Sequence, residues 1–231
     1  MDGKAGTAMQ TILHDYWRSS ASYRVRIGLN LLGLPYRSVS IDLLGGDQRG
    51  ADYLARNPQG LVPALEIDGV VLTQSLAILE YLNETHAAGW LGSASLEKAR
   101  IRALAYAIAM EVHPVCNLRV ARYAVSLGGT TLEDWMKHFI RNGLADFEAM
   151  LAQTRRPSQY CHGSVVSLAD ICLVPQVYNA ARWNVDMSEF PKTAAIAAQL
   201  EQLEAFLAAH PDRAIPNRDL SRILWHGRAG L

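Results

Sequence analysis

The sequence has no excess of charge of either sign and no long hydrophobic run. Lysine and arginine together number 22, as do aspartate and glutamate, so the formal net charge is zero. Proteins that bind nucleic acid normally carry a basic excess or patch, so we expect no nucleic-acid partner. The apolar runs fall well short of the ~18 residues that a membrane-spanning helix needs, so we expect no membrane partner.

Cysteine is also scarce, with Cys116, Cys161 and Cys172 as the three in the chain. Their odd number and their spacing form neither a metal-binding pair nor a redox pair, so we expect no structural disulfide and no metal site. Residues 1–10 lack the hydrophobic core of a signal peptide. These features together predict a cytoplasmic protein in a reducing compartment.

Apolar residues, by contrast, are abundant and make up 50% of the 231 residues. A chain of this size and composition can bury one large core or two modest ones. The first third mixes strand and helix patterns, whereas the later patterns are helical. The predicted order in the first third is strand, helix, strand, short helix, two strands and helix, over residues 11–16, 20–32, 36–43, 45–57, 61–72 and 75–86.

Turn and cap residues separate these patterns. We expect Ser20 to cap the first helix and the glycine and proline of residues 33–35 to end it. Asp68-Gly69 predicts a tight hairpin turn between the last two strands, and Ser75 is expected to cap the helix that follows. The first two strands should be parallel and joined by a right-handed crossover, and the hairpin should add antiparallel strands.

A stretch of small residues at 87–94 is the expected linker to a helical second part. Pro114 interrupts a long helical region over 96–125. The segment S-L-A-D at the start of a later helix is a capping-box pattern with aspartate in place of glutamate. Further helices are predicted at 135–151, 167–181 and 196–207.

Arg18-Ser19-Ser20 is the first of three segments that could carry chemistry, because it joins the first strand to the first helix. The N-terminus of a helix presents unpaired N–H groups and a partial positive charge, which stabilise anions. A serine hydroxyl at this point could donate a hydrogen bond to a thiolate. Taken alone, however, the segment favours two serines that merely cap the helix.

Val62-Pro63 and Gln74-Ser75 are the other two segments, and each has two interpretations. If the Val62–Pro63 bond is cis, the backbone N–H and C=O of Val62 can turn outward and pair with a peptide-like ligand. A trans proline at the start of a strand is the usual alternative. Gln74 and Ser75 could bind an α-carboxylate and an amine beside a positive helix end, or simply cap that helix.

The order of these three segments resembles that of the glutathione transferases. The segment RSSASYRVRIGL is similar to the S-S-C-x-W-R-V-R-I-A-L signature of the zeta class, which includes maleylacetoacetate isomerase. The same class is resembled by the stretches NPQGLVPALEIDG, QSLAILEYLNET, HPVCNLRV and LADICLVPQVYNAARWNVD. The resemblance extends over about residues 11–211.

The resemblance implies the glutathione transferase fold. In that fold an α/β, thioredoxin-like N-terminal domain, here residues 1–87, binds glutathione as the cofactor, and an all-α C-terminal domain, here residues 95–231, faces the second substrate. The family also implies a homodimer. Residues 214–231 have a weak pattern and no assigned role.

The resemblance also implies which residues form the site. Ser19 and Ser20 would be catalytic, with Ser19 stabilising the thiolate of glutathione. His113 and Asn117 are four residues apart and would share a helix face near the site. The full set expected to bind glutathione is Ser19, Ser20, Ala21, Ser22, Tyr23, Arg24, Gln48, Val62, Gln74, Ser75, His113, Asn117, Leu118 and Arg119.

The reaction implied by the resemblance is cis–trans isomerisation of maleylacetoacetate to fumarylacetoacetate in aromatic amino acid catabolism. A thiolate adds to the conjugated cis double bond, the bond rotates as a single bond, and elimination leaves the trans product. Because the small-molecule substrate is a dicarboxylate, guanidinium groups suit it. Arg18 and Arg182 are the implied substrate-binding residues, with Arg119 and Arg122 as further candidates.

The chain departs from the signature at two positions. Ala21 replaces the cysteine and Tyr23 replaces the tryptophan. Loss of the cysteine argues against a thiol–disulfide oxidoreductase but leaves isomerisation possible, since the nucleophile belongs to glutathione. Three alternatives stay open: a maleylpyruvate isomerase, a general glutathione transferase or dehalogenase acting on small electrophiles, and a non-catalytic binding module of the same fold.

Overall fold

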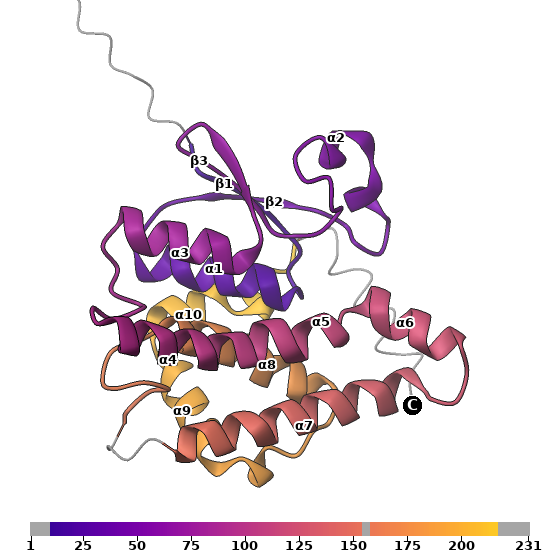
Figure 1. The fold of residues 1–231 in the computed structure, drawn as a ribbon. Helices are drawn as coiled ribbons and strands as arrows, with labels where there is room; N and C mark the ends of the chain where they lie inside the picture. Colours follow the sequence, from indigo (N-terminus) through magenta and orange to yellow (C-terminus); the bar gives the residue numbers. More distant parts are fainter. Residues whose placement is uncertain (1–9, 154–157, 217–231) are drawn as a thin grey trace, which may run out of the picture. The chain divides into compact units, whose positions relative to one another are not determined.

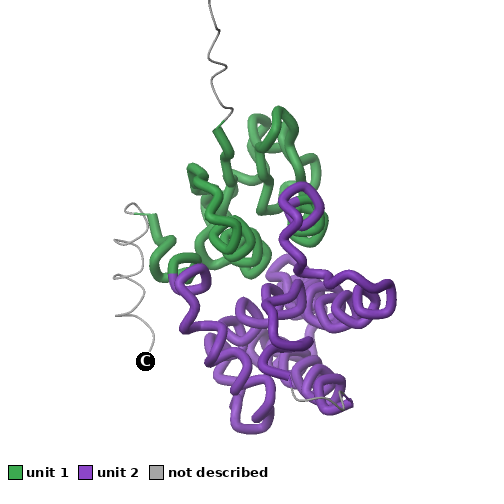
Figure 2. The backbone as a smooth tube through the Cα atoms, turned by 90° about the vertical axis from the view of Figure 1, so that its left-hand side faces the viewer, with its two compact units in different colours: residues 1–81, 208–231 green, residues 82–207 purple. Residues whose placement is uncertain are grey.

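The computed structural model describes residues 10–153 and 158–216. The chain forms two compact units, one of residues 1–81 and 208–231 and the other of residues 82–207 (Figure 2). This division differs from the predicted domains of 1–87 and 95–231 chiefly at the C-terminal end, because the chain returns to the first unit at residue 208. Most of the tail at 214–231 lies outside the described residues.

The first unit contains a four-stranded sheet in the order β2-β1-β3-β4 (Figure 1). As predicted, β1 pairs in parallel with β2, and the hairpin of β3 and β4 joins the sheet with antiparallel pairing. The fully buried Leu13 and Leu65 pair across β1 and β3. The strands are β1 (Ile12–Asp15), β2 (Arg37–Ser40), β3 (Ala64–Ile67) and β4 (Val70–Thr73).

The hairpin turn between β3 and β4 is the one predicted from its dipeptide. Asp68 and Gly69 have φ angles of 51° and 80°. Positive φ at both central residues is the geometry that favours Asp-Gly in a two-residue hairpin. The hydroxyl of Tyr81 donates to Oδ2 of Asp68 at 2.6 Å, which ties the turn to the following helix.

Helices α1 and α3 lie on the same side of this sheet (Figure 1), which gives the predicted thioredoxin-like arrangement. The prediction that Ser20 caps α1 was wrong by one residue. Ser19 is the cap, because its backbone is extended and its Oγ accepts a hydrogen bond from the N–H of Ser22. Ser75 likewise is the first residue of α3 rather than its cap. The helical segments of this part are α1 (Ser20–Leu31), η1 (Asp47–Arg49), α2 (Ala51–Leu54) and α3 (Ser75–Thr85).

Helices are the regular elements of the second unit in its described residues, and turns and loops connect them. The predicted long helix at 96–125 is divided into α4, a π-helical segment η2, α5 and α6. The predicted helix at 196–207 is also divided, since a turn at 201–203 separates α9 from α10. The bounds are α4 (Ser95–Tyr106), η2 (Ala107–Val112), α5 (His113–Val115), α6 (Leu118–Ser126), α7 (Leu132–Ala152), α8 (Leu168–Arg182), η3 (Met187–Glu189) and α9 (Pro191–Leu200). The next helix, α10 (Glu204–Ala209), crosses the boundary between the units, and η4 (Pro211–Arg213) belongs to the first unit.

Two local features concern the start of α8 and the packing of α7. The predicted capping box at the start of α8 is confirmed, because the carboxylate of Asp170 accepts hydrogen bonds from the N–H and the hydroxyl of Ser167. On α7, a side chain at Gly143 would collide with Val112 of η2. Glycine therefore lets α7 and η2 approach closely. Of the helices in the described ranges, none is long and apolar enough to cross a membrane.

Candidate functional site

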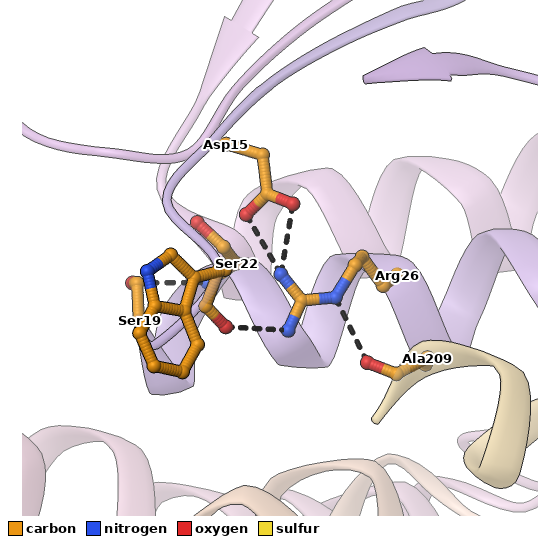
Figure 3. A network of polar contacts seen from close by, with 6 residues as sticks. Asp15, Ser19, Ser22, Arg26 and Ala209 are labelled. Carbon is orange, nitrogen blue, oxygen red and sulfur yellow. Dashed lines mark hydrogen bonds and ion pairs between the residues drawn. The ribbon is translucent and has the colours of Figure 1, made fainter. Parts of the chain in front are cut away.

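The turn between β1 and α1 presents Ser19 at the start of a 12-residue helix. The N–H of Ser19 donates to the carbonyl of Tyr16 at 2.9 Å, which closes the turn. The Oγ of Ser19 accepts from the N–H of Ser22 at 3.2 Å (Figure 3). Because no described residue accepts the hydroxyl proton of Ser19, that proton is available to a ligand at the positive end of the helix.

The residues that follow Ser19 are less exposed to solvent than Ser19 is, apart from Ser20. Ser20 is half-buried, and Ala21, Ser22, Tyr23 and Arg24 are buried. Ser22 is fully buried, and its Oγ has no hydrogen-bond partner among the described residues. These four side chains therefore support the turn from the interior. Their direct contact with glutathione stays a prediction.

Arg24 joins the first predicted segment to the third. Its Nη1 donates to the hydroxyl of Ser75 at 3.1 Å, so the starts of α1 and α3 are linked inside the unit. Next to Ser75, Gln74 is exposed and has a φ of 67°. Its side-chain amide donates to Oε1 of Gln59 at 2.8 Å. Gln59, which no sequence signal singled out, thus belongs to the same surface.

The peptide bond between Val62 and Pro63 is cis. Within the described part of the chain, the N–H and C=O of Val62 have no hydrogen-bond partner, so both can pair with a ligand. The carbonyl of the preceding residue, Leu61, accepts from the hydroxyl of Tyr53 at 2.6 Å and from the side-chain amide of Asn57 at 2.7 Å. These two donors anchor the segment that carries Val62.

Tyr53 and Asn57 were missed by the sequence reasoning. They are 4% and 2% exposed, and burial raises the pKa of Tyr53 to about 12, so its hydroxyl stays a donor. Their shared acceptor is a main-chain carbonyl, which leaves no mark on the sequence. The Asn-Pro dipeptide at Asn57 is typical of turns and was the one available signal.

Gln48 of η1 is a further predicted glutathione ligand in the first unit. Its amide nitrogen donates weakly to the carbonyl of Leu43 at 3.4 Å. Its Oε1 is buried without a hydrogen-bond partner among the described residues. An orphaned acceptor of this kind costs free energy unless a ligand or water donates to it, which fits a role in binding.

The predicted ligands of the second unit do not form one helix face. His113 begins α5 and is half-buried, but the helix ends at Val115. Asn117 has extended backbone and caps α6, where its Oδ1 accepts from the N–H of Arg119 at 3.0 Å. The expectation of a shared face for His113 and Asn117 was therefore wrong, because the chain breaks between them. Leu118, which follows the break, is 40% exposed.

The candidate carboxylate-binding arginines differ in how they are held. Arg18 donates to the hydroxyl of Tyr16 at 3.1 Å, and its guanidinium carbon lies 5.0 Å from the ring centre of Trp17. Such stacking holds a guanidinium while leaving other donors available. Arg182 is exposed at the end of α8 and donates to Asn179 at 3.3 Å. Arg119 and Arg122 are exposed on α6.

Comparisons with known proteins show the family to which the chain belongs. Residues 18–85 match the family model of the glutathione S-transferase N-terminal domain. The chain is 53% identical to maleylacetoacetate isomerase of Rhizobium meliloti (strain 1021), over 90% of this chain and 100% of that protein.

Solved structures give the same result. The holo structure of a maleyl pyruvate isomerase, a bacterial glutathione S-transferase of the zeta class, has a TM-score of 0.85 and 36% identity, over 89% of this chain and 99% of that one. Maleylacetoacetate isomerase of Methylobacterium extorquens AM1, with bound malonate and glutathione, has a TM-score of 0.83 and 38% identity, over 89% and 98%.

The fold and these likenesses define a glutathione S-transferase. The chain belongs to the zeta class of that family, together with the maleylacetoacetate isomerases.

Proposed function

We propose that this protein is a glutathione-dependent cis–trans isomerase that converts maleylacetoacetate to fumarylacetoacetate. The observation that carries the proposal is Ser19, whose hydroxyl proton is available at the positive end of α1. The 53% identity to a maleylacetoacetate isomerase over that protein's whole length supports the choice of substrate.

The chain's own groups suit a thiolate at this position. A thiol with an ordinary pKa of ~8.5 is mostly protonated at neutral pH, and lowering that pKa by ~2 units corresponds to ~2.7 kcal/mol. A hydroxyl donor and a helix N-terminus together are of the right size to supply this free energy. Glutathione, when bound, supplies the nucleophile that adds to the double bond and is later released.

The orphaned polar groups of the first unit fit a peptide-like cofactor. The N–H and C=O of Val62 are suited to pairing with its main chain, and Oε1 of Gln48 offers a further acceptor. Gln74 and Ser75, at the start of α3, suit an α-carboxylate because the helix end is positive. His113, Asn117, Leu118 and Arg119 remain proposed ligands from the second unit.

The chain supplies no competing thiolate. All three cysteines are free and buried. Burial raises the pKa of Cys116 to about 12 and also raises that of Cys161. Ala21 removes the remaining cysteine that the zeta signature would place at the turn. Isomerisation therefore depends on the thiol of glutathione, and thiol–disulfide chemistry by the protein itself is not part of the proposal.

The rest of the proposal concerns the substrate and its setting. Arg18 and Arg182 would bind the two carboxylates, with Arg119 and Arg122 as further candidates, and a relative has been solved with malonate and glutathione bound. The proposed setting is a cytoplasmic homodimer in the breakdown of tyrosine and phenylalanine. Maleylpyruvate is the second candidate substrate, since a maleyl pyruvate isomerase is 36% identical over 99% of its length.

The direct test is isomerisation of maleylacetoacetate and of maleylpyruvate by the purified protein, followed by absorbance with and without glutathione. We expect turnover that requires glutathione and is faster with maleylacetoacetate. A higher kcat/KM for maleylpyruvate would transfer the assignment to that substrate. Glutathione binding without turnover on either substrate would contradict the isomerase proposal.

Replacing Ser19 by alanine removes the proposed hydrogen bond to the thiolate. We expect Ser19→Ala to raise the pKa of the bound thiol by about 1 unit and to lower the isomerisation rate at neutral pH by roughly tenfold. The thiolate absorbance of the enzyme–glutathione complex, titrated against pH, measures the first effect. If neither quantity changes, the stabilising donor is Ser20 or a backbone N–H.

Replacing Arg182 by alanine tests the proposed carboxylate contact. We expect Arg182→Ala to raise KM for the dicarboxylate by roughly tenfold, since a charge-assisted hydrogen bond contributes ~1.5–3 kcal/mol before solvent screening reduces it. KM for a neutral electrophile should stay nearly constant. Equal increases for both compounds would show that Arg182 does not recognise the carboxylate.

Tyr53→Phe removes one of the two donors to the carbonyl of Leu61 with little change of shape. We expect the affinity for glutathione to fall about 2- to 10-fold, as for the loss of a single hydrogen bond, because the segment carrying Val62 becomes less fixed. Calorimetric titration measures this. Tyr81→Phe is the matched control, since it removes a hydroxyl bonded to the β3–β4 turn. Equal losses in both variants would contradict the positioning argument.

A further inference from the structure

Arg26 of α1 is a buried charge that the proposed mechanism does not use. It is 2% exposed, and all three of its nitrogens donate hydrogen bonds (Figure 3). Nη1 lies 2.8 Å from each carboxylate oxygen of Asp15, and Nη2 lies 3.0 Å from the carbonyl of Trp17. Nε lies 2.9 Å from the carbonyl of Ala209. One guanidinium thus joins α1 to two other stretches of chain, residues 15–17 and Ala209.

Two of these partners belong to the turn that presents Ser19. Asp15 ends β1, and Trp17 lies two residues before Ser19. Between them is Tyr16, whose carbonyl accepts the N–H of Ser19. Arg26 therefore bonds the residues directly before and after Tyr16, which accepts the N–H of Ser19. A shift of the guanidinium would move the hydroxyl of Ser19 relative to the helix end.

The third partner comes from the segment by which the chain returns to the first unit, residues 208–216. Ala209 is the last residue of α10, and carbonyls at a helix C-terminus lack partners within the helix. Arg26 satisfies one of them with a charged donor. The same segment contacts α1 a second time, since the rings of His210 and Tyr23 meet edge to face at 6.1 Å, and Arg26 lies 5.3 Å from the ring centre of Tyr23.

We propose that Arg26 is a positioning residue for Ser19. Through Arg26, the geometry of the turn between β1 and α1 depends on the position of the return segment. The inference rests on the proposed role of Ser19. It extends that role to a residue that touches neither cofactor nor substrate. Because the guanidinium is planar and has donors on both sides, lysine keeps the charge but cannot reach all three acceptors.

The test compares wild-type protein with Arg26→Lys in the complex with glutathione. We expect Arg26→Lys to raise the pKa of the bound thiol by about 0.5–1 unit and to lower kcat at neutral pH about 3- to 10-fold, with little change in KM for glutathione. Arg141→Lys is the matched control, because it alters an exposed ion pair with Glu189 in the second unit and should leave the thiol pKa unchanged. A wild-type thiol pKa in Arg26→Lys would overturn the proposal.

A second variant tests the return segment and does not alter the buried charge. His210 is partly exposed, so His210→Ala should fold while loosening the contact with Tyr23. We expect a smaller rise of the thiol pKa in the same direction, and an unchanged value would overturn the dependence on the return segment. If wild-type protein itself does not lower the thiol pKa, the proposed role of Ser19 has failed instead.

Discussion

The arrangement of the first unit depends on hydrogen-bond acceptors for the buried guanidinium of Arg26. Removing a guanidinium from water costs several kcal/mol unless charged and polar partners replace the lost hydration. The carboxylate of Asp15 and the carbonyls of Trp17 and Ala209 are those partners for Arg26. Because these partners come from the β1–α1 turn region at residues 15–17 and from the end of α10, the hydrogen bonds of one side chain connect α1 to both.

Local sequence signals were enough to predict the strands and helices of residues 10–85, but not the return of the chain to the first unit. The order of strands and helices follows from periodicity, and Asp68-Gly69 specifies its turn because few other dipeptides tolerate positive φ at both positions. The cap of α1 was predicted at Ser20 but is Ser19, because the sequence of two adjacent serines does not show which one has extended backbone. Pro114 marked the interruption of the predicted helical region at 96–125, and α5 ends one residue after it. The turn at 201–203, which divides the predicted helix at 196–207, was missed because helical periodicity continues across it without a visible change in the apolar pattern.

The candidate site could be proposed from the sequence where its residues lie in a segment that resembles the family signature. Ser19, Gln74 and Val62 lie in stretches that the zeta-class resemblance marks. Tyr53 and Arg26 were not found. Tyr53 donates to the main-chain carbonyl of Leu61, and Arg26 donates to the carbonyls of Trp17 and Ala209 in addition to the carboxylate of Asp15. A carbonyl has the same chemistry at every position, so its partner carries no compositional signal, and three-dimensional coordinates are needed to identify it.

The return of the chain to the first unit has a consequence for dividing this protein. A fragment ending near residue 87 would contain the whole sheet but would lack the α10 carbonyl that Arg26 bonds and the ring of His210 against Tyr23. The first compact unit therefore does not coincide with a continuous stretch of the sequence. A fragment that keeps every hydrogen bond of Arg26 would need residues 208–216 joined to residues 10–81, as in a circularly permuted chain.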